Sequence, residues 1–311
     1  MLPALAVASL AFRKSQPHDL MAAYLSFMRV VRFSDEYQLV APLYGMESTE
    51  LRDRDVSRGQ SVQRWFAASD GRALGAVDVW VRPDDRRFMT FRGDRAEAVA
   101  PLVDAVSVAV HRSLFTTVDL GDAARFEALA GSGFAVETIG ERFTVRFCDA
   151  LALVRRAWVP AGYRVASVAD IDEGKVFELD NAIRNLVPGS DGWTGNRDWF
   201  RDELHAPEFD RDAYLIAVER SSDQCVGLLR IWRNQDGPRL GLLGVLPDHR
   251  GGPLAAALLK QGLGVASQWG HDSFVTETSP SNAHTYPRLA RVSADQLGQF
   301  AQMSRQPRLP A

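Results

Sequence analysis

The chain has 311 residues, of which 46% are apolar and 24% are charged, and its net charge at neutral pH is -3. These values predict two folded domains of roughly 150 residues each and exclude a chain that is disordered throughout. The weak negative charge excludes a general attraction to nucleic acid or to anionic membranes.

Cysteine and histidine patterns predict neither a metal site nor a disulfide framework. The two cysteines, Cys148 and Cys225, are far apart and outside any C-x-x-C spacing, and the six histidines are scattered. Zinc sites and small disulfide scaffolds need clustered ligands or paired cysteines. We therefore expect a reducing compartment and no bound metal.

The N-terminal stretch from Met1 to Phe12 is apolar enough to raise the question of export. It has no basic residue before the apolar run, and it is too short to span a bilayer. A packed helix or a frayed end is expected instead of a signal peptide, and the protein is expected in the cytoplasm.

Hydrophobic periodicity and turn signals define the expected elements of the first half. A linker is expected at Asp149–Gly162, where Arg155, Arg156 and Pro160 interrupt the apolar pattern. Before it, the pattern predicts a helix at 18–33, a charged connection at 47–59, strands at 61–68, 73–81 and 87–91, a helix at 96–111, a strand at 115–119, a helix at 122–130 and a strand pair running to residue 147.

The pattern restarts after the linker. A helix capped by Asp170 is expected to run to about Leu186, because Asp is a good N-cap residue. Around it, the sequence predicts a strand at 163–167, a helix at 197–204, strands at 213–219, 225–232 and 240–245, a helix after residue 253, a strand at 273–278, a helix at 282–291 and a weak strand near 297–303.

A glycine-bearing loop between a buried strand and an apolar helix dominates the second half. It contains Arg250, Gly251 and Gly252 and opens the helix that includes Ala255 and Ala256. Free backbone N–H groups and the positive end of the helix dipole form a natural binding site for phosphate. Many strand-turn-helix joints with glycine bind nothing, so the loop by itself leaves both interpretations open.

The sequence contains an internal repeat, which allows the glycine loop to be compared with a second copy. The segment Trp65 to Gly75 aligns with Leu215 to Gly227, each being a strand, a polar turn and a strand, and Arg92-Gly93 aligns with Arg250-Gly251. The chain therefore reads as two copies of one α/β unit, at about residues 1–150 and 160–305. In the first copy, Asp94 and Glu97 occupy the loop and would repel phosphate, so only the second copy is expected to bind an anion.

The segment Val245-Leu-Pro-Asp-His-Arg250-Gly-Gly-Pro-Leu-Ala255 resembles motif A of the GNAT superfamily of N-acetyltransferases, whose pattern is Val-x-Pro-x-x-Arg-Gly-x-Gly-x-Gly/Ala. The resemblance implies two tandem GNAT-like domains, the first degenerate, each with a mixed, mostly antiparallel sheet flanked by helices. It also implies acetyl-CoA as co-substrate. The residues that this implies at the cofactor are Leu243, Gly244, Val245, Arg250, Gly251, Gly252, Leu254, Ala255, Ala256 and Asn282.

Two departures from the family pattern concern the phosphate loop and the general acid. Pro253 occupies the position of the second glycine and has no N–H to donate. The tyrosine that the family often places seven residues after the asparagine is Leu289 here, and Tyr286 lies one turn earlier. Tyr286 is the candidate acid.

The remaining candidates concern the base and the acceptor. Strand 240–245 contains no acid, so Glu277 on the next strand is the candidate base, although a strand-end acid facing solvent is the alternative. Asp180, Asp191 and Trp193 lie where the resemblance implies an acceptor pocket. A solvated helix face explains the two acids equally well, and core packing explains the tryptophan.

The leading hypothesis is an acetyl-CoA-dependent N-acetyltransferase whose acceptor is the primary amine of a small molecule, such as an amino sugar, an antibiotic or another specialised metabolite. The amine would attack the thioester directly. A non-catalytic acyl-CoA-binding or regulatory module is the alternative, and acetylation of a protein terminus ranks lower. Neither nucleic acid nor membrane is expected as a partner, and the protein is expected to be a monomer or a homodimer.

Overall fold

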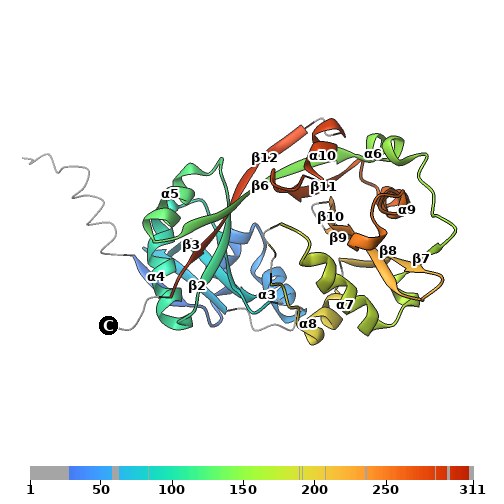
Figure 1. The fold of residues 1–311 in the computed structure, drawn as a ribbon. Helices are drawn as coiled ribbons and strands as arrows, with labels where there is room; N and C mark the ends of the chain where they lie inside the picture. Colours follow the sequence, from blue (N-terminus) through green and yellow to red (C-terminus); the bar gives the residue numbers. More distant parts are fainter. Residues whose placement is uncertain are drawn as a thin grey trace, which may run out of the picture. The chain divides into compact units, whose positions relative to one another are not determined.

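The computed structural model describes residues 28–57, 63–82, 84–188, 190, 192–206, 208–234, 237–283, 285–292 and 295–307 (Figure 1). The apolar N-terminal stretch lies outside the described residues. Contacts divide the chain into two compact units, the first comprising the residues up to Asp78 with Phe91–Ala109, and the second comprising Val79–Thr90 with the chain from Val110 onward. The predicted division near residue 150 falls inside the second unit and stays a prediction. Within the described ranges, no helix has the length and apolar character that crossing a membrane requires.

The first unit contains strands β1, β2 and β3 in that order. Its core packs Val40, Leu51, Phe66 and Ala76 together. The elements are β1 (Arg29–Arg32), α2 (Tyr37–Val40), a 3-10 helix (Ala41–Tyr44), α3 (Ser48–Ser57), β2 (Gln63–Ser69), most of β3 (Arg72–Val81), the end of β4 (Arg87–Arg92), a 3-10 helix (Ala96–Ala98) and nearly all of α4 (Val99–Val110).

Two predictions for the first unit are wrong. Residues 18–27 of the expected helix at 18–33 lie outside the described residues, and its described end is strand β1, which pairs antiparallel with β2. Its central residues, Val30 and Val31, are β-branched, and strand pairing overrides their helical spacing. The expected connection at 47–59 contains helix α3, in which Leu51 is the one fully buried apolar residue. One apolar anchor is too little periodicity to predict a helix.

The second unit contains the rest of the sheet, in the strand order β4-β5-β12-β6-β11-β10-β9-β8-β7. All its registered pairs are antiparallel except β4 with β5 and β10 with β11. Its further elements are β5 (Leu114–Asp119), α5 (Ala123–Gly131), β6 (Ala135–Arg146), α6 (Phe147–Val154), β7 (Tyr163–Ser167), α7 (Glu173–Arg184), α8 (Arg197–Glu203), β8 (Phe209–Glu219), β9 (Cys225–Asn234), β10 (Gly237–Val245), α9 (Leu254–Ala266), β11 (Ser273–Thr278), α10 (Tyr286–Val292) and β12 (Asp295–Arg305).

The last strands of the two sequence repeats are exchanged. β12, which ends the second repeat, lies between β5 and β6, and β6, which ends the first repeat, lies between β12 and β11. Figure 1 shows these two strands, green and red, side by side. Each repeat therefore completes its sheet with a strand from the other repeat.

Three expectations for the second unit are corrected. The expected strand pair is the single strand β6; its Gly140 marks a close approach rather than a turn, because a Cβ there would collide with the Phe300 ring. The expected linker at 149–162 includes most of α6, whose buried Phe147, Ala150 and Val154 lie on one face. Helix α7 is capped by Asp172, which accepts a hydrogen bond from Lys175 N at 3.1 Å, and not by Asp170.

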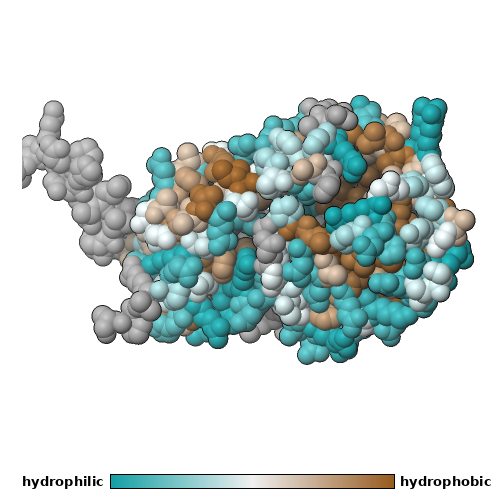
Figure 2. Space-filling view, viewed as in Figure 1, coloured by the Kyte–Doolittle hydropathy of each residue, from teal (hydrophilic) through white to brown (hydrophobic). Residues whose placement is uncertain are grey.

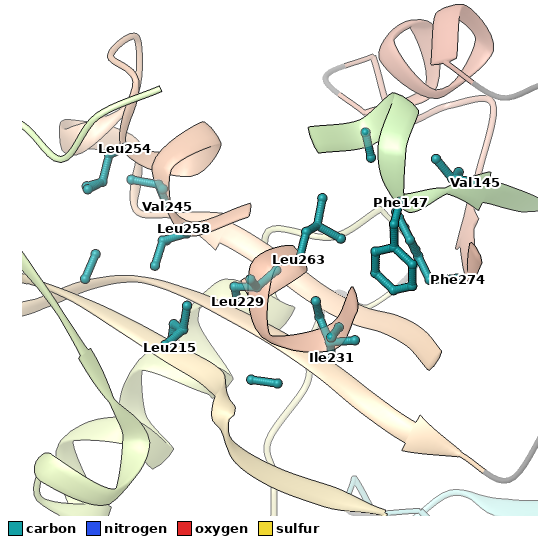
Figure 3. Packing of buried hydrophobic residues seen from close by; sticks show 14 of the residues in the cluster. Val145, Phe147, Leu215, Leu229, Ile231, Val245, Leu254, Leu258, Leu263 and Phe274 are labelled. Atoms are coloured by element: carbon teal, nitrogen blue, oxygen red, sulfur yellow. The ribbon is translucent and has the colours of Figure 1, made fainter. Parts of the chain in front are cut away.

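Helices cover both faces of this sheet, with α7 and α8 on one face and α6, α9 and α10 on the other. Figure 3 shows the core beneath α9, where Leu254, Leu258 and Leu263 meet Leu229 and Ile231 of β9. Burying each such side chain contributes about 1.5–3 kcal/mol. Packing of this kind holds the start of α9 at the end of β10.

Matching glycines support the repeat. Gly93 and Gly251 both have left-handed backbone, with φ of 86° and 89°. A Cβ at Gly75 would lie 3.0 Å from Ala98 Cβ, and a Cβ at Gly227 would lie 3.1 Å from Val245 Cγ2 and 3.4 Å from Leu258 Cδ1. Both β3 and β9 thus use glycine to let the following helix or loop approach closely.

Candidate functional site

Strands β10 and β11 separate after a short stretch of pairing. Their parallel register joins Arg239 to Val275 and Leu240 to Thr276 and then ends. β10 continues beside β9 as far as Val245, while β11 continues beside β6. A register shift at residue 241 marks a bulge in β10, and bulges bend a strand away from its neighbour. Residues 241–245 therefore have no paired strand on the side of β11, and we call this unpaired side of β10 the gap.

The loop after β10 is held by its own arginine. Arg250 Nε donates a hydrogen bond to the Val245 carbonyl at 2.8 Å, and Arg250 N donates to Pro247 O at 3.1 Å. His249 Nδ1 lies 3.1 Å from Tyr163 Oη of β7. These contacts fix the end of β10 relative to the start of α9.

Backbone N–H groups collect at the start of α9. Pro253 is the N-cap residue, and no side chain caps the helix. The first-turn N–H groups of a helix have no intrahelical acceptor, so those of Leu254, Ala255 and Ala256 remain for an anion. Gly252 is exposed, and nothing lies within 4 Å of the position of a Cβ there. The loop is open to a ligand, and Figure 2 shows hydrophobic surface in a recess over β11, α10 and α9.

The matching loop of the first unit is closed and acidic. A Cβ at Gly93 would lie 3.1 Å from both Leu43 Cδ2 and Leu74 O, whereas nothing lies within 4 Å of the corresponding position at Gly251. Arg95 lies 3.8 Å from Asp94 and 3.9 Å from Glu97. The first loop thus presents carboxylates where the second presents bare backbone.

Glu277, the candidate base, is engaged by two arginines. Its Oε1 accepts a hydrogen bond from Arg142 Nε at 2.9 Å, and its Oε2 accepts one from Arg239 at 2.8 Å. Alternation along β11 places Glu277 on the sheet face opposite to buried Phe274, which packs under α9. Glu277 therefore faces the α7 side of the sheet.

Tyr286, the candidate acid, lies on the other face. Its ring meets Phe143 edge-on at 6.2 Å, and its phenol hydrogen-bonds to Glu141, which raises the pKa of Tyr286 above its ordinary value. Asn282 precedes α10, and its Oδ1 accepts a hydrogen bond from Thr285 N at 3.1 Å. The Oδ1 atom of Asn282 is thus engaged by the backbone just before α10.

The sequence did not single out Arg142 and Glu141, which contact the candidates Glu277 and Tyr286. Glu141 and Arg142 are consecutive on the exchanged strand β6 and pair in register with Thr278 and Glu277 of β11. Glu141 is only 5% exposed and also accepts a hydrogen bond from Gln299 at 2.9 Å. Because β6 also contains Glu137 and Arg146, its pattern of charges does not single out Glu141 and Arg142.

The predicted acceptor residues are partly brought together. Asp180 is 4% exposed and forms an ion pair with Arg184 at 2.8 Å, so it is not on a solvated face. The Arg184 guanidinium lies 4.6 Å from the centre of the buried Trp193 ring. Asp191 lies outside the described residues. Two residues that the sequence did not single out, Glu203 and Arg230, form a second buried ion pair at 2.7 Å, and burial raises the pKa of Glu203.

Replacing Glu141 by glutamine is expected to lower the pKa of Tyr286 towards that of a free phenol. The carboxylate accepts the phenol hydrogen and repels a phenolate, and a neutral amide at this position removes that charge. Subtracting the alkaline absorbance titration of each protein's Tyr286→Phe version isolates this tyrosine. Identical difference curves for the wild type and for Glu141→Gln would contradict the contact.

Both cysteines are free, and the described residues contain no cluster of three or more His, Cys, Asp or Glu that would suit a metal. Cys148 is exposed and Cys225 is buried.

Comparison with known proteins agrees with this geometry. Residues 181–290 match the model of the acetyltransferase (GNAT) family. No curated protein sequence matches the chain significantly. A GCN5-related N-acetyltransferase from Sphaerobacter thermophilus is 15% identical, with a TM-score of 0.65 over 91% of this chain and 97% of that one.

Two further solved structures share the fold. A tandem GNAT protein from the clavulanic acid biosynthesis pathway is 15% identical, with a TM-score of 0.65 over 91% of this chain and 100% of that one. A glucosamine N-acetyltransferase region of a fungal multi-domain β-N-acetylglucosaminidase is 10% identical, with a TM-score of 0.63 over 89% of this chain and 38% of that one. The chain has the tandem GNAT fold, and residues 181–290 match the GNAT acetyltransferase family.

Proposed function

We propose that the protein is an N-acetyltransferase that uses acetyl-CoA and accepts the primary amine of a small molecule. One observation carries the proposal: β10 and β11 separate directly before an open loop that presents backbone N–H groups. A long acyl-carrying arm fits between separated strands, and a pyrophosphate fits the start of a helix. Acetyl-CoA supplies an acetyl group activated as a thioester.

One set of residues binds the co-substrate, and another transfers protons. The N–H groups of residues 251–256, Pro253 excepted, bind the pyrophosphate, while Leu243, Gly244 and Val245 border the arm with Asn282 nearby. Glu277 accepts the proton of the incoming ammonium on the α7 face, and Arg142 and Arg239 orient its carboxylate. Tyr286 donates a proton on the opposite face, where Glu141 positions the phenol.

Gly252→Asp is expected to remove most of the stabilisation by acetyl-CoA. The substitution is unstrained, because Gly252 has no positive φ and an open Cβ position. A carboxylate about 6 Å from a phosphate costs about 3 kcal/mol at an effective dielectric constant of 20, on the order of a hundredfold in Kd. Thermal unfolding with and without acetyl-CoA measures the effect. Arg250→Glu combined with Gly252→Asp is expected to remove any remainder.

Two control variants test whether the effect of Gly252→Asp depends on the charge of the new side chain, on its size and on its place in the chain. Gly252→Asn has the same size without the charge and is expected to keep most of the stabilisation. Arg95→Glu places an added carboxylate in the matching loop of the first unit and is expected to keep all of it. If acetyl-CoA stabilises the wild type and Gly252→Asp equally, the loop does not bind the pyrophosphate.

A second candidate function is an acyl-CoA-binding module without turnover. It is favoured by the contacts of both proton-transfer candidates, since Glu277 is paired with two arginines and Tyr286 with Glu141. Steady-state release of CoA with a panel of small amines, amino sugars included, distinguishes the two. Acceleration by an amine supports the transferase, and slow hydrolysis that no amine accelerates supports the binding module.

A further inference from the structure

A buried group of polar side chains lies between the sheet of the second unit and helices α7 and α8. We call it the inner polar cluster; it consists of Asp180, Arg184, Glu203, Tyr214 and Arg230. Tyr214 of β8 and Arg230 of β9 are direct register partners, and they are 0% and 3% exposed. Two acids and two arginines balance the charge of the cluster.

Two groups of this cluster make no hydrogen bond with any described residue. They are Tyr214 Oη and Arg230 Nε, and both atoms are buried. An unsatisfied buried polar group loses its hydrogen bonds to water without gaining others, so native proteins rarely keep one without a reason. Here two lie on neighbouring strands and face the same helices.

The first unit provides a control inside the same chain. The alignment of the repeats places Arg64 and Asp78 at the positions of Tyr214 and Arg230. There, Arg64 Nε donates to Tyr44 Oη at 2.7 Å and to Asp78 at 2.6 Å, and its NH1 donates to Asp55 at 2.9 Å. Tyr44 Oη in turn donates to Asp78 at 2.7 Å. At these two matched positions, Arg64 and Asp78 of the first unit are hydrogen-bonded within that unit, whereas Tyr214 Oη and Arg230 Nε of the second unit are not.

The inner polar cluster lies beside the gap between β10 and β11. Arg230 pairs in register with Leu242, two residues beyond the last residue of β10 that pairs with β11. Gly244 is two residues further along and faces Ile183, one turn after Asp180 on α7. Two strand residues span roughly 7 Å, so the cluster is within reach of a small molecule whose amine lies in the gap.

We infer that the acceptor amine carries a hydroxyl or carbonyl oxygen that Tyr214 and Arg230 bind. This inference rests on the proposed function and adds the class of acceptor. Arg230 Nε–H is a donor only and the Tyr214 hydroxyl can donate, so the group they recognise is an oxygen acceptor. A hydroxyl can in turn donate to one of the carboxylates of the cluster.

Charge decides which oxygen fits. An ammonium would face the N–H of a guanidinium, so the amine itself is directed to the gap and not into the cluster. A carboxylate would add an unbalanced charge to a buried group whose acids and bases already pair, which is costly. A neutral oxygen meets the two unpartnered groups without that cost.

The test uses amino alcohols with two to six carbons, each compared with the alkylamine of equal length. We expect the kcat/KM of at least one amino alcohol to exceed that of its alkylamine by tenfold or more, with an optimum at one length. Tyr214→Phe is expected to reduce that preference at least fivefold, mainly through the KM of the amino alcohol. Because the hydroxyl has no described partner, the variant is expected to keep the wild-type melting temperature.

Tyr44→Phe is the matched control, since it removes a hydroxyl that is fully bonded in the first unit. It is expected to lower the melting temperature and leave the preference unchanged. Equal kcat/KM values for amino alcohols and alkylamines, acceptance of neither, or a preference that survives Tyr214→Phe would overturn the inference while acetyl-CoA still stabilises the protein. If acetyl-CoA gives no stabilisation, the proposed function fails first, and the inference fails with it.

Discussion

Residues 160–311, expressed without the first half, are expected not to fold as a monomer. The fragment lacks β6, which pairs with β11 from Arg146 opposite Ser273 to Glu141 opposite Thr278 and pairs with β12 on its other side. It also lacks Phe143, Val145 and Phe147, which are buried in the core under α9. Three such side chains contribute roughly 6 kcal/mol, which is comparable to the whole stability of a typical domain at about 5–15 kcal/mol.

In this fragment, the edges of β11 and β12 that normally pair with β6 are exposed. Exposed edges pair with other chains, so aggregation or a strand-exchanged dimer is expected. Size-exclusion chromatography with light scattering and far-UV circular dichroism melts measure this outcome. The matched control begins at Ala135 and restores β6 and α6, and it is expected to recover a cooperative melt. A monomeric 160–311 fragment that melts cooperatively would contradict the importance of the exchange.

Arg64→Met in the first unit is expected to destabilise the protein by about 3–5 kcal/mol, because it removes the buried guanidinium that neutralises Asp55 and Asp78. Arg64 is 1% exposed and bonds to Asp55, Asp78 and Tyr44. Its acidic partners raise the pKa of Arg64 despite burial, so the guanidinium stays charged. The midpoint of urea denaturation, followed by tryptophan fluorescence, measures the loss.

Arg52→Met is the matched control for that loss. Arg52 pairs with Asp35 at 3.3 Å, but the two side chains are 53% and 75% exposed. Exposed pairs contribute about 0–1 kcal/mol, so the control is expected to shift the midpoint little. Equal shifts for the two variants would show that the Arg64 cluster is not a buried ionic network. Loss of acetyl-CoA stabilisation is not expected from either variant.

Local signals explain which elements the sequence predicts well. The second half predicts most strands to within a few residues, and β7 (Tyr163–Ser167) and β11 (Ser273–Thr278) at their observed bounds. Short runs that contain aromatic and β-branched residues and are bounded by turn residues are a local signal, which both β7 and β11 carry. The sequence did not predict α3 or β1. The apolar periodicity of α3 is too short, and the apolar spacing around β1 fits both a helix and a strand.

By itself, the sequence determined the two-fold repeat and the mixed α/β fold. It also determined the GNAT-like glycine loop and its acidic counterpart at Asp94 and Glu97. Each of these can be recognised from the order of residues within short segments of the chain. Tertiary structure alone decided the exchange of β6 with β12, and with it the contacts of Arg142 with Glu277 and of Glu141 with Tyr286. It also decided that two buried atoms, Tyr214 Oη and Arg230 Nε, make no hydrogen bond with a described residue. The physical reason is that strand pairing and burial join residues more than a hundred positions apart, and local spacing carries no information about such partners.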